Sequence, residues 1–234
     1  MSLPKIEYPL FELTLPSDKS KVQFRPFTVK EEKLLLIAQE SEDQKDRVRA
    51  MRQIVNNCCI DLPKDIGLLP SFDLEYCFLK IRSKSIGNIV ELKYRDLTDQ
   101  KIYSFEVDLD ELEITYDENH NKTIKIADDL GMIMAYPTME MLEKVDTNAE
   151  DNETAFKLIR LCVDTIYDAE NAYVAKEYSE KELSEFIDSL PVKAFEDITT
   201  FFSTLPVLKH ELHYKDSEGT EKTITLQGID DFFQ

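Results

Sequence analysis

The sequence predicts an α+β fold in which antiparallel β-hairpins alternate with two groups of α-helices. A hairpin pattern occurs twice, because residues 91–96 read ELKYRD and residues 211–216 read ELHYKD. In both copies a polar turn and a second run of alternating apolar and polar residues follow. Stretches with helical spacing lie between these β-rich segments, and this grouping favours α+β over a doubly wound parallel sheet.

The repeated hairpin indicates binding or assembly rather than catalysis, because nothing in its loops looks like catalytic chemistry. Two similar hairpins can also arise from β-propensity alone. If the repeat is genuine, Tyr94 shares a strand face with Leu92, and Tyr214 shares one with Leu212, since residues two apart point the same way. We expect each hairpin to place its apolar face against helices and to offer a similar edge to partners by strand addition.

The first third of the chain predicts a hairpin followed by three helices. Residues 8–27 alternate out and back across a polar turn. Thr28 stands three residues before Glu31, which is the spacing of a capping box, so a helix begins there. A second helix with one apolar face follows, and a third, capped by Ser71, ends near Gly87.

The rest of the chain predicts a β-rich stretch over residues 89–134, then helices, then the second hairpin copy. A long helix is expected over residues 152–178, with apolar residues at heptad-like spacing. Those residues are Phe156, Ile159, Val163, Ile166 and Tyr173. Ser179 and Glu182 form a second capping box, and Pro191 opens the next helix.

The best candidate for a domain boundary is the polar stretch 146–152. It divides the chain into residues 1–146, with the N-terminal hairpin, helices and central β region, and residues 147–234, with helices and the C-terminal hairpin. The stretch is also short enough to be a simple helix connection, so one continuous domain is the alternative.

Composition excludes several classes of partner. The 234 residues are 42% hydrophobic and 32% charged, which is typical of a globular protein able to bury a core. The 47 acids and 28 Lys and Arg give a net charge of -19, which repels phosphate backbones and anionic lipid, so we expect no nucleic acid or membrane partner. No apolar run approaches the roughly 20 residues of a membrane span, and the first residues lack a signal-peptide core, so we expect a cytoplasmic protein.

No recognisable catalytic or cofactor-binding motif is present. No Ser, Cys or Asp has a histidine at the spacing of a known nucleophile and base pair. The four cysteines form no CxxC pair and are predicted to be reduced thiols, and a phosphate-binding loop is absent. We therefore predict no enzyme activity and no cofactor.

One loop resembles a metal site. Asp117, Asn119 and Asn121 match positions one, three and five of a calcium loop, and Asp128 matches position twelve. The sixth position lacks the required glycine and the flanks alternate as strands, so we favour a hairpin turn. A calcium-binding protein, or a metal-dependent hydrolase that also uses Asp129, is the alternative function.

Four segments of the first hundred residues carry recognisable patterns. They are residues 8–10 (YPL), 24–35 (FRPFTVKEEKLL), 56–58 (NNC) and 73–85 (DLEYCFLKIRSKS). In this order they resemble the baseplate proteins of T-even-type contractile-tailed phages, in particular baseplate hub proteins or hub-assembly chaperones. The resemblance implies a non-enzymatic role in building the tail hub by binding other tail or baseplate hub proteins, in the host cytoplasm during assembly and in the virion if the chain is retained.

Seven residues are predicted to contact partners: Arg25, Phe27, Lys80, Arg82, Lys84, Phe232 and Phe233. Three of them form a small basic patch at a helix end of an otherwise acidic chain. The two terminal aromatics are costly to expose, so they either join the core or insert into another subunit. The acidic helices over residues 146–197 are a further candidate docking surface, and a general acidic adaptor of the host cell is a third class of function.

Overall fold

The computed structural model describes residues 6–41, 44–145 and 152–232. Helices combine with small antiparallel sheets, which confirms the α+β class. The chain divides into two compact units: unit 1 comprises Met1–Thr115 and Val207–Gln234, and unit 2 comprises Tyr116–Pro206. This division differs from the predicted boundary, because the C-terminal hairpin belongs with the N-terminal residues; residues 146–151 of that boundary lie outside the described residues.

The helical part of unit 1 begins with the predicted hairpin. Its elements are strands β1 (Phe11–Thr14) and β2 (Lys21–Phe24), helices α1 (Val29–Glu40), α2 (Gln44–Cys58) and α3 (Ser71–Ser85), and the short 3-10 helix η1 (Ile66–Leu68). The two strands pair antiparallel. The predicted capping box is confirmed, since the Thr28 N–H donates to Glu31 Oε2 at 2.9 Å while the Thr28 side chain accepts from the first turn of α1.

The start of α3 differs from the prediction. Ser71 is the first helical residue and Pro70 occupies the capping position, so the expected Ser71 cap is wrong. Pro70 is extended there, and its carbonyl accepts the N–H of Leu74 at 3.2 Å. The helix ends two residues before Gly87, whose φ of 134° suits glycine and turns the chain into the next strand.

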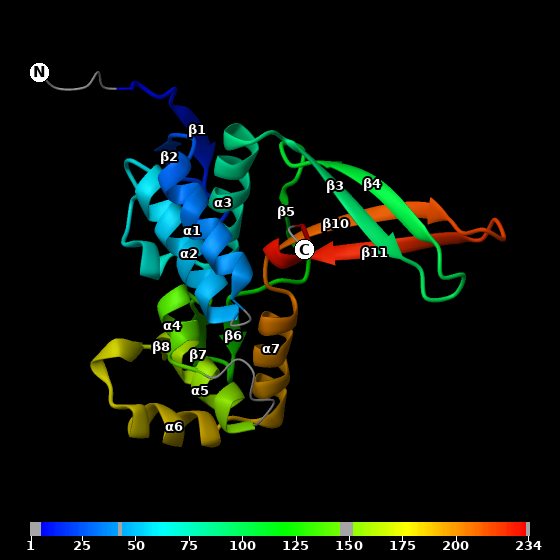
Figure 1. Ribbon diagram of the computed structural model, residues 1–234. Coiled ribbons are helices and arrows are strands. Elements are labelled where there is room, and N and C mark those ends of the chain that lie inside the picture. The colour runs from blue at the N-terminus through cyan, green and yellow to red at the C-terminus, as the bar shows by residue number, and fades with distance from the viewer. Residues whose placement is uncertain (1–5, 42–43, 146–151, 233–234) are drawn as a thin grey trace, which may run out of the picture. The chain divides into compact units, whose positions relative to one another are not determined.

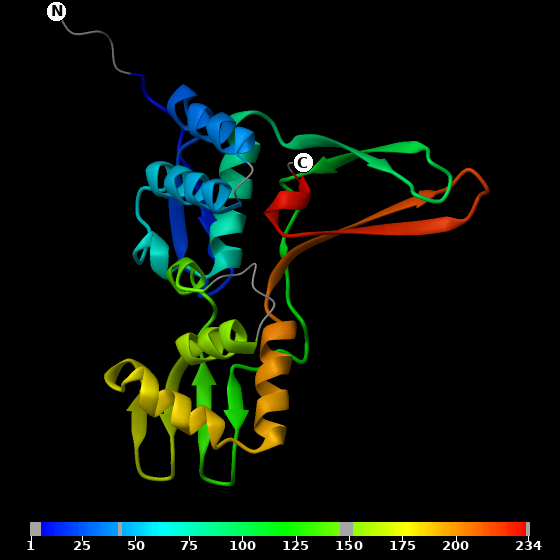
Figure 2. The ribbon, with the colours of Figure 1, turned by 60° about the horizontal axis from the view of Figure 1, so that its bottom comes forward.

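Both copies of the repeated hairpin form as predicted. Strand β3 (Ile89–Arg95) pairs antiparallel with β4 (Ile102–Asp108), and β10 (Val207–Lys215) pairs with β11 (Glu221–Gln227). A short strand, β5 (Ile114–Thr115), adds to the base of β10, and the 3-10 helix η3 (Ile229–Phe232) follows β11. Both hairpins extend away from helices α1 to α3, side by side, in Figures 1 and 2.

Unit 2 is an antiparallel sheet packed against helices. Its elements are β6 (Thr123–Lys125), β7 (Gly131–Met134), α4 (Met139–Glu143), α5 (Asn152–Cys162), β8 (Val163–Tyr167), β9 (Ala172–Val174), η2 (Ala175–Glu177), α6 (Glu180–Asp188) and α7 (Val192–Ser203). The strand order is β6-β7-β8-β9, visible in Figure 2. Side chains from this sheet and from α5, α6 and α7 form one buried core, with Met132, Ile159 and Phe201 among them.

The predicted helix over residues 152–178 is wrong beyond Cys162. Helix α5 passes directly into β8, and Val163 and Ile166 belong to a strand that pairs with β7. The VDTIY sequence of β8 is rich in β-branched residues, which favours a strand, but Val163 and Ile166 stand three apart, which is the spacing of a helix face. A register shift in the pairing with β7, between Ile133 and Met134, accommodates this spacing in the strand. The neighbouring strand decides between helix and strand. The capping box at Ser179 is confirmed, and Pro191 lies one position before α7 rather than inside it.

Candidate functional site: the paired-hairpin arm

The two hairpins place their apolar side chains on facing surfaces. In the first hairpin the shared face carries Val90, Leu92, Tyr94, Tyr103, Phe105 and Val107, and in the second it carries Leu212, Tyr214, Ile224 and Leu226. Tyr94 therefore shares a face with Leu92, and Tyr214 with Leu212, as predicted. We call residues 89–108 and 207–227 together the paired-hairpin arm.

Aromatic contacts show that the two apolar faces pack on each other. The ring centroid of Tyr214 lies 4.6 Å from that of Tyr103, 5.8 Å from Phe105 and 6.3 Å from Tyr94. The expectation that each hairpin packs this face against helices is therefore wrong at these positions. An isolated two-stranded hairpin is marginally stable in water, and mutual packing removes apolar surface of both hairpins at once.

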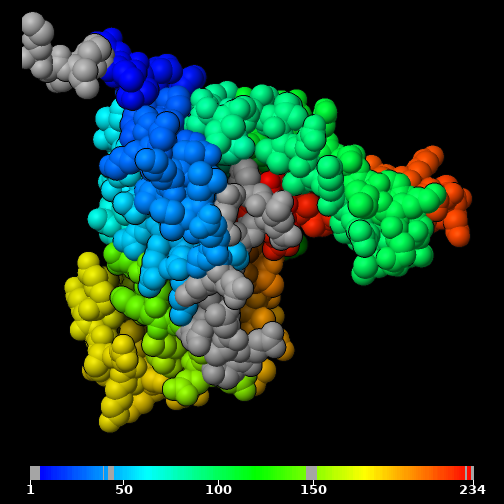
Figure 3. Space-filling view, in the orientation of Figure 1, coloured from blue at the N-terminus to red at the C-terminus, as the bar shows by residue number. Residues whose placement is uncertain are grey.

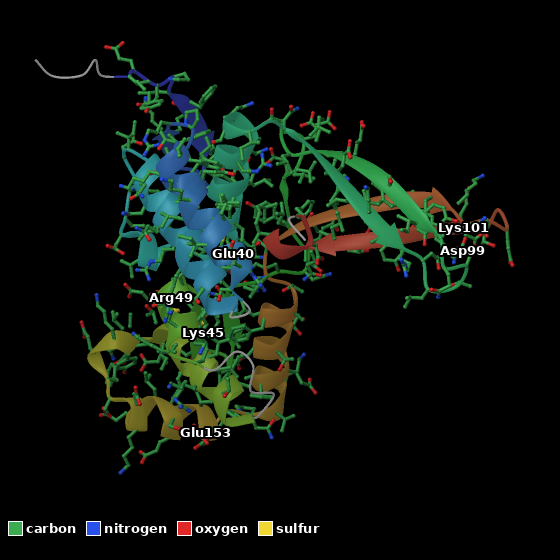
Figure 4. The ribbon with its side chains drawn as sticks, in the orientation of Figure 1. Glu40, Lys45, Arg49, Asp99, Lys101 and Glu153 are labelled. Carbon is green, nitrogen blue, oxygen red and sulfur yellow. The ribbon has the colours of Figure 1, made fainter. Side chains whose placement is uncertain are left out.

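A polar network joins the ends of the two hairpins. Asp96 Oδ2 accepts a hydrogen bond from the Tyr214 hydroxyl at 2.8 Å and forms an ion pair with Lys222 Nζ at 2.6 Å. Asp99 Oδ2 accepts from the Tyr103 hydroxyl at 2.7 Å and from the Ser217 hydroxyl at 2.9 Å. We call these six residues the tip network. Figure 4 shows Asp99 at the far end of the β3–β4 hairpin, where the network fixes one hairpin to the other.

Charge and burial in the tip network shift the pKa of its members in consistent directions. The ion pair with Lys222, helped by hydrogen bonds from Thr98 and Tyr214, lowers the pKa of Asp96 to about 2. The hydrogen bond to Asp99 and burial raise the pKa of Tyr103 to about 12. Burial and the hydrogen bond to Asp96 raise the pKa of Tyr214 to about 12. The network is thus fully formed at neutral pH, with both carboxylates ionised and both phenols protonated.

Polar side chains dominate the outward faces of the arm, and Ile89 and Ile102 are exposed apolar residues among them. The exposed side chains include Lys93 and Arg95 on β3 and Glu211, His213 and Lys215 on β10. In the space-filling view the β3–β4 hairpin, in green, stands out from the helices, with part of the orange second hairpin beyond its end (Figure 3). The arm therefore presents a large surface for its small number of residues.

The side chain of Arg25, which was predicted to contact partners, forms hydrogen bonds and an ion pair within unit 1. Its guanidinium contacts Glu31 Oε1 at 3.1 Å and Oε2 at 3.3 Å, and it donates to the carbonyl of Asn57 at 3.2 Å. Burial opposes ionisation of Glu31, but hydrogen bonds from Arg25 and Thr28 outweigh it and lower the pKa of Glu31 to about 2. This ion pair ties β2 to the first turn of α1.

The predicted basic patch on α3 binds the loop that follows β4, over residues 109–113. Lys80 Nζ donates to the carbonyls of Asp110 at 2.8 Å and Leu112 at 2.9 Å, and Lys84 forms an ion pair with Asp110 at 2.7 Å. Arg82 donates to the carbonyl of Gly87 at 3.3 Å. The three side chains therefore stabilise the base of the β3–β4 hairpin, because they contact the chain just before β3 and just after β4. Their contact with partners stays a prediction.

The predicted aromatic contacts have different surroundings. Phe27 is half-buried, and its N–H donates to Ser85 Oγ at 2.9 Å. Phe232 is completely buried within the chain, and Phe233 lies outside the described residues. Partner binding by these aromatics also stays a prediction.

The calcium alternative receives no support. Asp117 Oδ1 accepts the N–H of Asn119 at 2.8 Å, and Asn121 Oδ1 accepts the N–H of Thr123 at 2.9 Å, which is the bonding of polar turn residues. Asp128 is fully exposed and pairs with Lys125 at 3.3 Å. Among the described residues, no group of three or more His, Cys, Asp or Glu side chains could hold a metal ion.

The tip network, and the pairing of the hairpins through it, were not predicted from the sequence. The signal was present: both copies have an aspartate two residues after the tyrosine, Asp96 after Tyr94 and Asp216 after Tyr214. Each aspartate accepts the N–H of the residue two positions on, so both begin the same kind of turn. Asp96 accepts a hydrogen bond from Tyr214 of the other hairpin, whereas Asp216 forms an ion pair with Lys222 of its own hairpin. Nothing in the local sequence indicates this difference.

The paired-hairpin arm thus combines fixed geometry with exposed outer faces. Comparison with known families gives the class directly, because residues 8–234 match the family model of the T4 bacteriophage base plate protein. The chain belongs to this family and is a bacteriophage baseplate protein, which implies interaction with other baseplate or tail proteins. No curated protein and no solved structure matches it significantly. In the described part of the chain, no helix is long and apolar enough to cross a membrane.

Proposed function

We propose that the protein is a baseplate hub protein or a hub-assembly chaperone that acts by stoichiometric, non-enzymatic binding to other hub proteins. The observation that carries this proposal is the paired-hairpin arm, whose two hairpins are braced by Asp96 at 2.8 Å from Tyr214 and 2.6 Å from Lys222. Family membership supplies the setting. Hub assembly would take place in the host cytoplasm.

A braced arm suits stoichiometric binding for a thermodynamic reason. Association loses affinity when side chains and loops must be ordered on binding. In the arm, the facing aromatics and the tip network order these residues before any partner arrives. Binding to a preformed surface therefore costs less entropy.

The net charge of the chain is concentrated in unit 2, which supports different binding roles for the two units. Residues 116–206 contain 20 Asp and Glu and 8 Lys and Arg, a net charge of -12 out of the -19 of the whole chain. Such a field attracts basic protein surfaces and accelerates encounter with them. We propose that unit 2 favours a basic partner in the hub.

The test follows the chain through assembly. A tagged copy is expressed in infected cells, hub intermediates and finished virions are separated by sedimentation, and each fraction is quantified by mass spectrometry. We expect the chain in hub intermediates at a fixed ratio to the hub proteins. Presence in finished virions as well identifies a hub component, whereas presence in intermediates alone identifies a chaperone.

The control is a variant whose arm is no longer braced, Asp96→Ala with Lys222→Ala. If the arm carries the function, this variant should enter intermediates less efficiently than the wild type. Complete absence of the wild-type chain from intermediates and virions would contradict the proposal.

A further inference from the structure

The outer edge of β11 has backbone groups that the hairpin does not use. In an antiparallel pair, every second residue exchanges backbone hydrogen bonds with the partner strand. The residues between them direct their backbone N–H and C=O groups away from the partner strand. Two bonds bracket the second hairpin, from Asp216 N–H to Thr220 O at 3.0 Å and from Gly228 N–H to Leu208 O at 2.8 Å. With the register of β10 and β11, they assign the exchanged bonds to the even-numbered residues of both strands.

The odd-numbered residues of β11 therefore direct their N–H and C=O groups away from β10. In the described part of the chain, β11 is the outermost strand of the sheet β11-β10-β5. The N–H of Gln227 is capped by Asp231 Oδ2 at 2.7 Å. Thr223 and Thr225, both exposed, form the centre of the open edge.

Charged side chains are more frequent at the outward positions of the other edges of the arm than on the β11 edge, where the charge is at one end, on Glu221. The same bracketing in the first hairpin, by Asp96 N–H to Lys101 O at 2.9 Å and Leu109 N–H to Asn88 O at 2.7 Å, assigns outward groups to the odd residues of β3 and the even residues of β4. Charged side chains at edges discourage strand pairing. They stand at the outward positions Glu91, Lys93 and Arg95 on β3, Glu106 and Asp108 on β4, and Glu211 and Lys215 on β10.

At the centre of the β11 edge, Thr223 and Thr225 are uncharged and β-branched, which favours strand pairing. They correspond in register to Ser104 and Glu106 of the first hairpin, because Thr223 pairs with His213 as Ser104 pairs with Lys93. The two hairpins are therefore alike in fold but not in how their second strands are protected.

We propose that the edge of β11 receives an extended segment of another baseplate protein as an added strand. This inference rests on the proposed function and assigns the binding to one edge of the arm. A second copy of the chain is disfavoured as the occupant, because two chains of charge -19 repel each other. The added strand would place apolar side chains beside Ile224 and Leu226 and hydroxyl or basic side chains beside Thr223 and Thr225, near Glu221.

The first test removes one outward N–H. Thr223→Pro deletes the donor at a position where proline is tolerated, because the N–H of an edge residue makes no bond within the sheet. Ser104→Pro is the matched control at the corresponding position of β4. We expect Thr223→Pro to lower the amount of chain in hub intermediates about tenfold, which is the effect of losing roughly one hydrogen bond between neutral groups. The amount of Ser104→Pro should stay near that of the wild type. Circular dichroism and melting curves establish that both variants fold.

A second variant and a direct measurement cover the case in which proline disturbs the hairpin. Thr225→Lys keeps the backbone donor and adds a charge of the kind that protects natural edges, and we expect it to reduce incorporation as well. Amide hydrogen exchange compares the purified wild-type chain with the chain in isolated intermediates. We expect exchange at Thr223 and Thr225 to slow at least about tenfold in the intermediates, with no change at Ser104.

The outcomes separate this inference from the proposed function. Absence of the wild-type chain from intermediates overturns the proposed function. A wild-type chain that enters intermediates without slower exchange at Thr223 and Thr225, together with normal entry of Thr223→Pro and Thr225→Lys, overturns the strand addition alone. If exchange at Thr223 and Thr225 in the purified chain becomes slower as the protein concentration rises, the occupant is a second copy of the chain. That result overturns the assignment to another protein.

Discussion

Unit 2 and the paired-hairpin arm hold their strands in different ways. Unit 2 covers a four-stranded sheet with helices and buries aliphatic and aromatic side chains in one core. The arm has two layers of two strands over most of its length, and aromatic contacts and the tip network join them. A broad core supplies global stability, whereas a narrow braced arm supplies exposed surface with fixed geometry. The same chain therefore separates stability from presentation.

The largest expected effect is in the core of unit 2. Ile159 is 6% exposed within that core, so Ile159→Ala should lower the free energy of unfolding by about 2 to 5 kcal/mol. Urea unfolding followed by circular dichroism measures the change. Lys157→Ala, at an exposed position of the same helix, is the control, with an expected change within about 0.5 kcal/mol. A loss below that size for Ile159→Ala would make this stripe a partner face instead of a core.

A smaller effect is expected where two strands of unit 2 approach closely. A Cβ at Gly131 would collide with the hydroxyl end of Tyr167 and lie 2.9 Å from the carbonyl oxygen of Ile124. Gly131→Ala should therefore cost about 1 to 3 kcal/mol of unfolding free energy. Tyr167→Phe removes the colliding oxygen, so the double variant should recover part of that loss. Equal stability of Gly131→Ala and the wild type would show that the sheet can shift to accept the methyl group.

In the arm, a substitution should loosen geometry without unfolding the protein. Lys222→Met removes the ion pair with Asp96 while keeping a long side chain. We expect faster amide exchange in both hairpins and a weaker near-ultraviolet circular dichroism signal from Tyr214 and Tyr103, with little change in the unfolding of unit 2. The comparison between the two regions would be broken if Lys222→Met lowered the stability of unit 2 as much as Ile159→Ala does.

The smallest effect concerns acid. The folded pKa of Asp96 is lowered to about 2 from an ordinary value of 3.8, so its contribution to stability is present above the ordinary value and is lost as the pH falls towards 2. The near-ultraviolet signal of Tyr214 should accordingly weaken between about pH 4 and pH 2. In Lys222→Met the same change should begin at higher pH, because the main cause of the shift is gone. An unchanged midpoint would show that Lys222 does not hold Asp96 ionised.

Local signals in the sequence predicted local structure well. The capping boxes at Thr28 and Ser179 each depend on residues three apart, and both hairpin copies depend on alternation and on a turn. The error beyond Cys162 arose because Val163 and Ile166 stand three apart, as on a helix face, and the strand accommodates them through a register shift in its pairing with β7. The tip network could not be predicted, because Asp96 and Tyr214 are separated by 118 positions in the sequence and no local pattern joins them.

The pairing of β5 with β10 makes unit 2 an insertion in the topological sense. Thr115, the last residue before unit 2, lies opposite Val207, the first residue after it, in antiparallel register. Chain that leaves and returns at neighbouring residues can be lengthened, exchanged or excised with little strain on what remains, as in tolerated domain insertions. A tight turn from Thr115 to Val207 would close β5 and β10 into an ordinary hairpin. Removal of the residues between these two positions would therefore leave the strand order β11-β10-β5 of unit 1 intact.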